Sequence, residues 1–339
     1  MPASNSHFLL RLLASVRRLL RHALPVCVLA GLCAAPAHAA DWPAEPVHIV
    51  LGYPPGSGTD ATARALADEM TNLLGVPTVV ENKPGASGRI GTAHVAKSKP
   101  DGHTILFGTG AELTLAPSTV KALPYDPVQD FRPVMLLTRS IGMVVAAPDF
   151  PARDMSGLVA EAKKHPGAIN YGSGGTYSIP HVLGLQFNLE AQIETTHIPY
   201  KGAGPMMVDL TSSRLQYAFS SPGAALSYVE AGKLRVLGIA APKRLPALPD
   251  VPTLAEQGYP GFDNGTWFGL LVPAGTPDAT VKKLHATLLR ALESPGLSRV
   301  LGNLYISPVG SSPEEFSTFL RKEIDRYHAL TQALGIQPE

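Results

Sequence analysis

The sequence predicts an α/β fold with largely parallel sheets, and two features of its 339 residues support this prediction. Short runs rich in β-branched residues alternate with amphipathic runs in which apolar residues recur every three or four positions. Charged residues make up only 16% of the chain and apolar residues 45%, which is typical of a protein with a large buried core. Length and composition therefore indicate one large or two medium domains.

The first 39 residues predict a secretory signal peptide. Four arginines and no acidic residue precede an apolar run over residues 23–35, and a small-x-small sequence ends at Ala39. The apolar run is too short to span a bilayer, so a retained membrane anchor is the less favoured interpretation. The pair Arg17-Arg18 leaves both Sec and twin-arginine export open.

Composition excludes several functions for the mature chain. Both cysteines, Cys27 and Cys33, lie inside the leader, so no thiol remains for a disulfide, a metal site or a nucleophile. Four of the 28 Lys and Arg also leave with the leader, and the other 24 face 27 Asp and Glu. This slightly acidic balance argues against nucleic acid as a partner. Beyond residue 40 there is no apolar run of 18 residues, so we expect a soluble mature protein.

The elements predicted first in the mature chain are three strands and two helices. The helix over 60–74 has its apolar stripe at Ala63, Leu66 and Met70, and Gly75 ends it. A second helix is expected over residues 90–97. The strands are expected over residues 47–53, 78–81 and 104–108.

The remaining chain continues the alternation of strands and helices. Strands are expected over residues 141–147, 169–172, 194–199, 215–219, 234–240 and 267–272. Helices are expected over residues 155–164, 205–211, 224–231, 278–293 and 313–334. About ten strands fit two sheets better than one, with seams near Ile141 and between Lys243 and Gly265. If the last third of the chain returns to the first sheet, two strands cross between two lobes.

The first candidate site is the loop Tyr53–Asp60 (YPPGSGTD), which joins a buried strand to a helix. Ligands of α/β sheets collect at the carboxyl ends of strands, and free amides at a helix N-terminus attract anions. The loop lacks the third glycine of a dinucleotide fingerprint and the Gly-Lys-Ser/Thr of a P-loop. A ligand loop and a tight turn capped by Thr59 or Asp60 both fit this pattern. The candidate ligand contacts are Tyr53, Gly56, Ser57, Gly58, Thr59 and Asp60.

The second candidate site is Tyr171–His181 (YGSGGTYSIPH), again between a strand and a helix. It offers hydroxyls, flexible amides and one histidine. The Gly-x-Ser-x-Gly order of a hydrolase nucleophile is absent, and no acid is placed to complete a triad. A packing or helix-start role is favoured for His181 over a ligand contact. The candidate contacts are Ser173, Thr176, Tyr177, Ser178 and His181.

A third strand leads into the glycine-rich loop His197–Pro205. Lys201 in this loop suits an anion, although a solvated surface lysine is the commoner role, and Gly202 is the second candidate contact. The segment Gly108–Glu112 ends another strand, and Glu112 is a further candidate ligand contact. The alternative is that this segment only connects two elements. The turn over residues 82–88 is expected to shape the edge of the cleft.

No His, Asp or Glu cluster has metal-ligand spacing, and no carboxylate pair fits acid–base catalysis. We therefore predict no catalytic residue, no metal and no cofactor. Loops of Gly, Ser and Thr suit the binding of an anionic small molecule better than its transformation. An enzyme is the least favoured alternative, and it would require Ser178, His181 or Lys201 for turnover.

These segments together closely resemble the Bug receptors, the periplasmic substrate-binding components of tripartite tricarboxylate transporters. The match runs in order over essentially the whole mature chain. Each segment is weakly specific alone, but the ordered set behind a signal peptide is highly specific. The segments are residues 53–60 (YPPGSGTD), 81–91 (ENKPGASGRIG), 99–103 (KPDGH), 197–202 (HIPYKG), 231–237 (AGKLRVL), 248–259 (LPDVPTLAEQGY) and 272–277 (VPAGTP).

The resemblance implies two α/β lobes of the type II periplasmic-binding class, joined by two crossing strands. Lobe 1 would comprise residues 42–141 and 265–339, and lobe 2 residues 142–264, with a ligand enclosed between them by hinge closure. Family ligands are mostly small carboxylates, including dicarboxylates and tricarboxylates, acidic amino acids and aromatic acids. The family holds the ligand carboxylate through amides, hydroxyls and ordered waters rather than through an arginine clamp.

The chain departs from the family pattern at a few positions. Ser57 stands where the first loop usually has a second glycine, and Tyr177 stands where the second loop usually has a small residue. Pro180 changes how the helix after that loop begins. In the family an acid at Asp60 faces a ligand amine or caps the helix, and its negative charge makes the capping role the favoured one for a carboxylate ligand.

The expected function is that of a periplasmic receptor. It would bind a small carboxylate between two lobes, close, and deliver it to integral-membrane permease subunits of the transporter. The alternative is a sensing role, in which the closed receptor engages the extracytoplasmic domain of a sensor kinase. Both roles use the same ligand-bound form, so the sequence does not separate them.

Overall fold

The computed structural model describes residues 42–262 and 265–338. The predicted signal peptide lies outside the described residues. Residues from Pro43 onward form one compact unit that contains two mixed sheets. In the described ranges, no helix combines the length and the apolar character needed to cross a bilayer.

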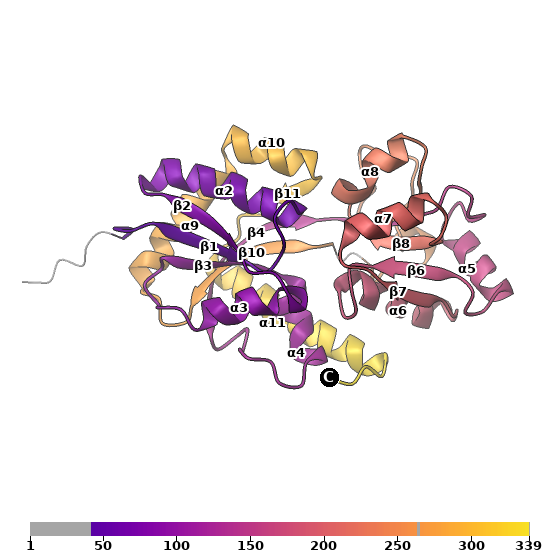
Figure 1. The fold of residues 1–339 in the computed structure, drawn as a ribbon, viewed down its shortest axis with the longest axis horizontal. Helices are drawn as coiled ribbons and strands as arrows, with labels where there is room; N and C mark the ends of the chain where they lie inside the picture. Colours follow the sequence, from indigo (N-terminus) through magenta and orange to yellow (C-terminus); the bar gives the residue numbers. More distant parts are fainter. Residues whose placement is uncertain (1–41, 263–264, 339) are drawn as a thin grey trace, which may run out of the picture. The chain divides into compact units, whose positions relative to one another are not determined.

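The first sheet has the strand order β11-β4-β10-β3-β1-β2. Its strands are β1 (Val47–Leu51), β2 (Thr78–Asn82), β3 (Thr104–Thr109), β4 (Phe131–Ser140), β10 (Trp267–Pro273) and β11 (Ile306–Pro308). Figure 1 shows α2 above these strands and α3 and α11 below them. The helical segments are α2 (Gly58–Leu74), η1 (Ala86–Gly88), α3 (Arg89–Ala96), η2 (Ala111–Leu115), α4 (Ala116–Thr119), α9 (Asp278–Leu292), α10 (Pro295–Asn303) and α11 (Pro313–Ala333).

The second sheet has the strand order β7-β6-β8-β5-β9. Its strands are β5 (Gly142–Ala146), β6 (Asn170–Ser173), β7 (Thr196–Pro199), β8 (Tyr217–Ser220) and β9 (Arg235–Ala240). Its helices are α5 (Met155–Lys164), α6 (Ile179–Ala191), α7 (Ala203–Thr211) and α8 (Pro222–Glu230), and a short turn η3 (Ala255–Gln257) follows β9. The helix predicted over residues 155–164 is confirmed at both ends.

The prediction of largely parallel sheets was wrong. In the first sheet β10 runs antiparallel to both of its neighbours, β3 and β4. In the second sheet β5 runs antiparallel to both β8 and β9. The cause is the path of the chain between the sheets. β4 leaves the first sheet and β10 returns to it, so these two adjacent strands must point in opposite directions, and the same holds for β5 and β9.

The sequence prediction also omitted β4 (Phe131–Ser140), which contains Pro133. A proline cannot donate a ladder hydrogen bond and is tolerated in a sheet at bulges. Pro133 pairs with Leu271 where the register between β4 and β10 shifts. The irregularity accommodates the missing amide, and the strand continues through it.

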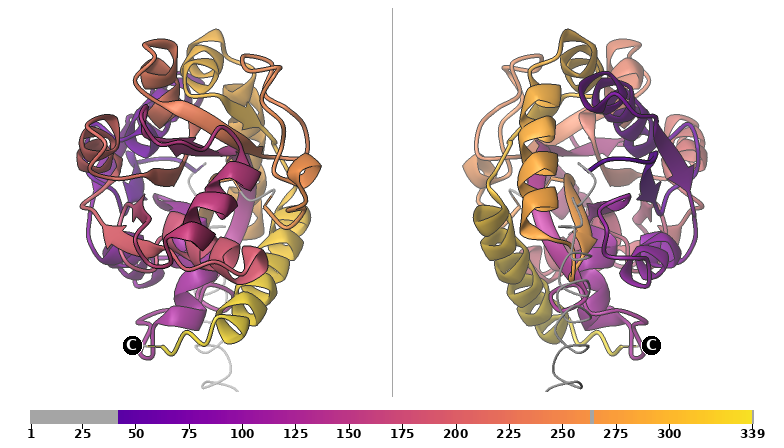
Figure 2. Two further views of the ribbon diagram at one scale, coloured as in Figure 1. Left: turned by 90° about the vertical axis from the view of Figure 1, so that its right-hand side faces the viewer. Right: turned by 90° about the vertical axis from the view of Figure 1, so that its left-hand side faces the viewer.

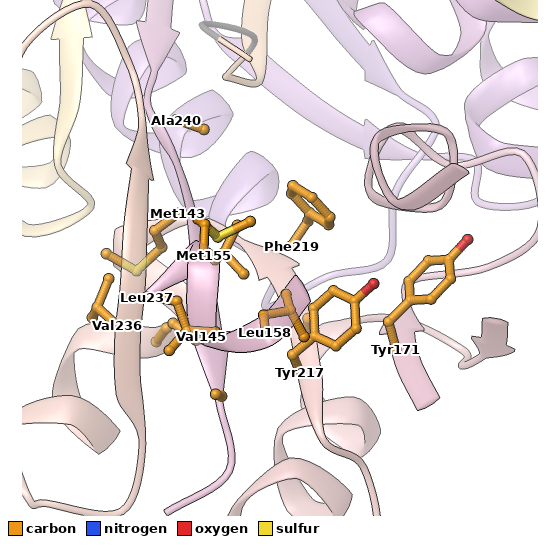
Figure 3. Packing of buried hydrophobic residues seen from close by; sticks show 14 of the residues in the cluster. Met143, Val145, Met155, Leu158, Tyr171, Tyr217, Phe219, Val236, Leu237 and Ala240 are labelled. Atoms are coloured by element: carbon orange, nitrogen blue, oxygen red, sulfur yellow. The ribbon is translucent and has the colours of Figure 1, made fainter. Parts of the chain in front are cut away.

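The core of the second sheet is rich in aromatic side chains. Figure 3 shows Tyr171, Tyr217 and Phe219, which point from β6 and β8 into this core. The rings of Tyr171 and Tyr217 stack with centroids 5.6 Å apart. The Tyr217 hydroxyl lies 2.9 Å from Thr195 Oγ1, so its polar end is satisfied inside the core.

The long helix α11 packs on β4, and Figure 2 shows it in yellow, running toward the C terminus. Its N-terminus carries a capping box, in which Ser312 and Glu315 exchange side-chain-to-amide hydrogen bonds. Its C-terminal half contributes Tyr327 to a small apolar cluster with Leu115 and with Val182 of α6. This helix therefore contacts elements that belong to both sheets.

Two chain segments connect the sheets, and they touch each other. Ile141 alone separates β4 from β5, and residues 241–266 connect β9 to β10. The Ser140 amide donates a hydrogen bond of 2.6 Å to the Thr266 carbonyl oxygen. At Gly265, a Cβ atom would lie 1.5 Å from the Ser140 carbonyl oxygen. Only glycine fits at this contact.

We predict that Gly265→Ala destabilises the protein by about 3 kcal/mol or more, because the new methyl group must push the two connecting segments apart. The free energy of unfolding, from urea denaturation, measures the effect. Gly302→Ala on α10 is the matched control, since no atom lies within 4 Å of its Cβ position. The control should stay within about 1 kcal/mol of wild type. Equal stability of both variants would contradict the tight contact.

Candidate functional site

A cavity of about 970 Å³ lies where strand-end loops of both sheets meet. The loops after β1, β2 and β3 come from the first sheet, and the loops after β6 and β7 come from the second. This is the position at which ligands bind in open α/β sheets. The lining residues are 52–59, 84–87, 109–111, 174, 178–180, 201–204 and 265–267, together with Tyr327.

The loop after β1 is held in shape by Asp60. Its carboxylate is 3% exposed and accepts hydrogen bonds from the Gly56 amide, Arg64 Nε and Asn82 Nδ2, at 2.9, 3.0 and 2.9 Å. Burial opposes its ionisation, but these donors outweigh burial and lower the pKa of Asp60. Asp60 does not line the cavity. Its charge is used to fix the loop, and Gly56, with φ of 81°, supplies the turn.

The N-cap of α2 is Ser57, two or three residues before the expected Thr59 or Asp60. Its hydroxyl oxygen accepts from the Asp60 amide at 3.1 Å, and its carbonyl accepts from Ala61. In the part of the chain that the structure describes, the amides of Gly58 and Thr59 have no acceptor. Both residues line the cavity, so α2 presents its positive end there.

Two helices of the second sheet also begin at the cavity. α6 starts after Ser178 and α7 after Gly202, and neither has a side-chain cap hydrogen bond. Ile179 and Ala203, the first residues of these helices, line the cavity. Three helix N-termini, from both sheets, therefore direct amide groups and partial positive charge into one space.

The second candidate loop is braced internally. Tyr177 has φ of 56°, and its amide donates to His181 Nδ1 at 3.0 Å. Ser178 Oγ donates to the Gly175 carbonyl at 2.7 Å. Of the predicted contacts in this loop, Ser178 lines the cavity, whereas Ser173, Thr176, Tyr177 and His181 do not.

His181 and His197 stack behind this loop with ring centroids 3.8 Å apart. Ser173 Oγ donates to the Gly175 carbonyl at 2.8 Å, and His197 Nε2 lies 2.7 Å from the same oxygen. Burial lowers the pKa of His181 to about 4, and burial together with the charge of His181 lowers the pKa of His197 to about 4. Both rings are therefore neutral near pH 7 and act as a polar support for the loop.

Glu112 is a buried acid directly behind the cavity wall. It is 1% exposed, and its oxygens accept from the Thr109 amide at 2.6 Å, Thr109 Oγ1 at 2.7 Å and the Tyr53 hydroxyl at 2.9 Å. Burial raises the pKa of Glu112 to about 7 despite these donors. Tyr53 and Thr109 line the cavity, whereas Glu112 does not. Glu112 thus reaches the cavity through its contacts to two lining residues.

Among the described residues, Lys201 is the one charged side chain that lines the cavity, and no described Asp or Glu lines it. Lys201 is exposed, and Gly202 next to it has φ of 107°. Together with the three helix N-termini, this ammonium gives the cavity a positive potential. The predicted contacts that the structure brings to the lining are Tyr53, Gly56, Ser57, Gly58, Thr59, Ser178, Lys201 and Gly202.

Sequence reasoning missed several lining residues. Trp267 and Tyr327 are buried aromatic residues on β10 and α11, and both border the cavity. Nothing in a strand or helix pattern distinguishes such residues from ordinary core residues. Gly110 and Ala111 were also missed, although they lie inside the strand-end segment that was singled out for Glu112.

The cavity lies at strand ends, and the described residues line it with backbone amides and hydroxyls, which suits the binding of a small molecule. A model of the TctC family, the tripartite tricarboxylate transporter family receptor, matches residues 62–336. The chain belongs to this family of receptors, which are binding proteins rather than enzymes.

Solved structures agree with this assignment. The periplasmic binding protein BugD is similar at a TM-score of 0.79 and 32% identity, covering 88% of this chain and 100% of BugD. Rpa4515 of R. palustris, solved with adipate, has a TM-score of 0.81 and 31% identity. The match covers 88% of this chain and 100% of Rpa4515. MatC of Rhodopseudomonas palustris, with bound malate, has a TM-score of 0.77 and 32% identity. The match covers 85% of this chain and 99% of MatC. The predicted α/β fold of periplasmic binding proteins is confirmed.

The buried acid gives a pH prediction. Because the pKa of Glu112 rises from 4.5 to about 7 on folding, the folded state retains a proton that the unfolded state has lost. Wild-type stability should therefore fall by about 3 kcal/mol from this group as pH rises from 4.5 to 7. The glutamine of Glu112→Gln cannot ionise. The free energy of unfolding of the variant should therefore rise relative to that of wild type over that pH interval.

Denaturant unfolding at several pH values measures this difference, and comparison with wild type removes the opposing contribution of the two histidines. Glu230→Gln, at an exposed position on α8, is the matched control and should follow wild type at every pH. A wild-type curve parallel to that of Glu112→Gln would show that Glu112 does not titrate in this range.

Proposed function

We propose that this chain is a periplasmic receptor that binds a small carboxylate in the 970 Å³ cavity and delivers it to the membrane permease of a tripartite transporter. The predicted signal peptide supports export, and membership of the receptor family supports the membrane partner. The relatives solved with adipate and with malate support a carboxylate as the ligand.

The observation that carries the proposal is the charge of the lining. Three helix N-termini and Lys201 contribute positive potential, and no acid among the described residues lines the cavity to oppose it. A carboxylate gains charge-assisted hydrogen bonds from such donors, whereas a cationic ligand would find no counter-charge. The one acid of the first loop, Asp60, is already occupied by three donors of the protein.

The size of the cavity supports a closing motion. Ligand pockets span roughly 300–1,000 Å³, so this cavity is at the upper end and a small carboxylate fills only part of it. We infer that lobe 1 (residues 42–141 and 265–339) and lobe 2 (residues 142–264) close on the ligand. Because Ser140 and Thr266 join the connecting segments, bending at this pair changes the distance between the loops of the two sheets. The permease would recognise the closed form.

The ligand contacts in this proposal come from both lobes. Tyr53, Gly56, Ser57, Gly58 and Thr59 contribute from the first loop, and Ser178, Lys201 and Gly202 contribute from the second lobe. Of the other predicted contacts, five form hydrogen bonds that hold these loops in place: Asp60, Glu112, Ser173, Tyr177 and His181. Thr176 is exposed and lies outside the lining of the cavity.

Thermal melting of the mature chain against a carboxylate panel tests the proposal. The panel contains citrate, C4–C6 dicarboxylates, acidic amino acids and benzoate-type acids. A ligand at about one hundred times its Kd stabilises the folded state by roughly 2.7 kcal/mol, which gives a clear rise in Tm. A flat panel, with no carboxylate released from the denatured protein and detected by mass spectrometry, would contradict it.

We predict that Lys201→Gln weakens binding of the best panel carboxylate about tenfold or more, because a charge-assisted contact contributes about 1.5–3 kcal/mol. Calorimetry at low and high salt measures Kd, and the salt dependence should be smaller in the variant. Lys233→Gln, an exposed lysine that does not line the cavity, is the matched control. Equal losses in both variants would remove Lys201 from the site.

A further inference from the structure

Three oxygen atoms form a compact cluster at the wall of the cavity. Glu112 Oε2 lies 2.7 Å from Thr109 Oγ1 and 2.9 Å from the Tyr53 hydroxyl, and the two hydroxyl oxygens lie 2.8 Å apart. The other carboxylate oxygen of Glu112 accepts from the Thr109 amide at 2.6 Å. Tyr53 and Thr109 line the cavity, so the buried acid is separated from it by these two residues.

The number of hydrogen atoms in this cluster decides what it offers to a ligand. When Glu112 is ionised, it only accepts, and the two hydroxyl hydrogens are both held within the cluster. Tyr53 and Thr109 then have only lone pairs to offer. When Glu112 is protonated, its O–H donates to one of the two hydroxyl oxygens, and that hydroxyl is free to turn its own hydrogen toward the cavity. A carboxylate ligand needs such a donor.

The tyrosines around Glu112 stay neutral in the range in which this acid titrates. Burial raises the pKa of Tyr53 and that of Tyr125, whose hydroxyl donates to the Glu112 carbonyl oxygen at 2.7 Å. On α11, which packs on η2, burial raises the pKa of Tyr327 to about 12. Burial raises the pKa of Glu112 to about 7, so this is the group of the cluster that changes charge near neutral pH.

The arginines on the surrounding helices are engaged with other groups. Arg89, which begins α3, donates from Nε to the Ala86 carbonyl oxygen at 2.7 Å, and Arg326 of α11 pairs with Glu323 at 2.9 Å. The segments η1, β3 and α4 also pack on η2, and they carry no charged residue. An ionised Glu112 is thus held by hydroxyl and amide donors, and an anion in the cavity adds a like charge that opposes its ionisation.

We propose that Glu112 takes up a proton from the solvent when the receptor binds its carboxylate ligand, so that the anion and one proton bind together. The protonated acid donates to Tyr53 or Thr109, and the hydroxyl that accepts this bond donates to the ligand. Glu112 acts through these two residues and is therefore a positioning residue. This inference rests on the proposed function and adds a regulation of the same site by pH.

The direction of the pH dependence follows from this exchange. A bound anion favours the protonated form, so it raises the pKa of Glu112 above the value of about 7 in the free receptor. Below about pH 6 the acid is protonated in both states, and the affinity is constant. Above about pH 7 the free receptor has lost this proton, and the affinity falls by up to about tenfold per pH unit until the bound form also ionises.

Calorimetry of the wild-type mature chain tests the inference without any variant. The probes are succinate, malate, adipate, citrate, glutamate and benzoate, and the tightest is carried through the pH series. Its Kd should rise about tenfold between about pH 6 and about pH 8.5. At about pH 8, the heats in phosphate and in Tris, which differ in ionisation enthalpy, should give uptake of more than about half a proton per ligand. His181 and His197, with pKa values of about 4, stay neutral throughout this range.

Glu112→Gln is the diagnostic variant. Its amide takes up no proton, yet its Nε2 can donate to the two hydroxyls as the protonated acid does. Its Kd should stay constant within about twofold over the pH series, and at about pH 8.5 it should bind the probe more tightly than wild type. A purely structural role would instead weaken binding at every pH. Glu230→Gln, at an exposed position on α8, is the matched control and should follow wild type.

Tyr53→Phe is the second variant, and it does not alter the acid itself. It removes a hydroxyl that donates to the ionised carboxylate, so the pKa of Glu112 in the free receptor should rise. The fall in affinity should therefore begin at a higher pH than in wild type. A fall that begins at the wild-type pH would overturn the coupling through this hydroxyl cluster.

The outcomes separate this inference from the function on which it rests. If a probe binds with a constant Kd and no proton uptake, the inference is overturned and the carboxylate receptor stands. If folded Glu112→Gln keeps the proton uptake of wild type, another group takes the proton and the inference is again overturned. Titration of the ligand itself affects both chains equally, so it does not produce a difference between them. If no probe binds, the proposed function fails and the inference with it.

Discussion

The site depends on the contact between the two segments that connect the sheets. Ser140 donates to the Thr266 carbonyl, and Gly265 lies so close to Ser140 that no side chain fits. This contact fixes where β4 leaves the first sheet and β10 returns, and hence the opposite directions of these strands. It also places Gly265 and Thr266 in the wall of the cavity. The contact between the connecting segments and the wall of the cavity therefore share Gly265 and Thr266.

Behind the binding surface, charged and polar groups position the loops without facing the ligand. Asp60 ties the first loop to α2 and β2, Glu112 joins Tyr53 to Thr109, and the stacked His181 and His197 support the second loop. Because each group is satisfied within the protein, the cavity itself presents amides, hydroxyls and one ammonium. Among the described residues, the acidic groups close to the cavity thus act within the protein, and Lys201 is the charged side chain of the lining.

The sequence predicts those parts of this structure that depend on local patterns. The helix over residues 155–164, the strands around residues 78–81 and 104–108, and the glycine-rich loops at strand ends all follow from periodicity and turn residues. The direction of β10 and β5 does not, because it is set by the path of the chain between two sheets. The strand β4 was not predicted for a similar reason. Pro133 is tolerated in this strand because it pairs with β10 at a register shift, which depends on the partner strand.

In the candidate site, too, the residues chosen from local patterns differ in outcome from those whose position depends on the whole fold. Gly56 to Thr59, Lys201 and Gly202 could be selected because flexible backbone next to a strand end predicts access to a ligand, and they do line the cavity. Asp60, Glu112 and His181 belong to the same strand-end segments, but their side chains accept hydrogen bonds from residues three or four positions away and do not line the cavity. Tyr327 lines the cavity only because α11 returns from the end of the chain to pack beside α6.

The most direct test of this account is a crystal structure of the mature chain with the carboxylate that gives the largest thermal shift. The account predicts the carboxylate oxygens about 3 Å from main-chain amides at the N-termini of α2 and of α6 or α7, with loops from both sheets in contact with the ligand. A carboxylate held by the loops of one sheet alone, or at a position outside the cavity, would contradict it.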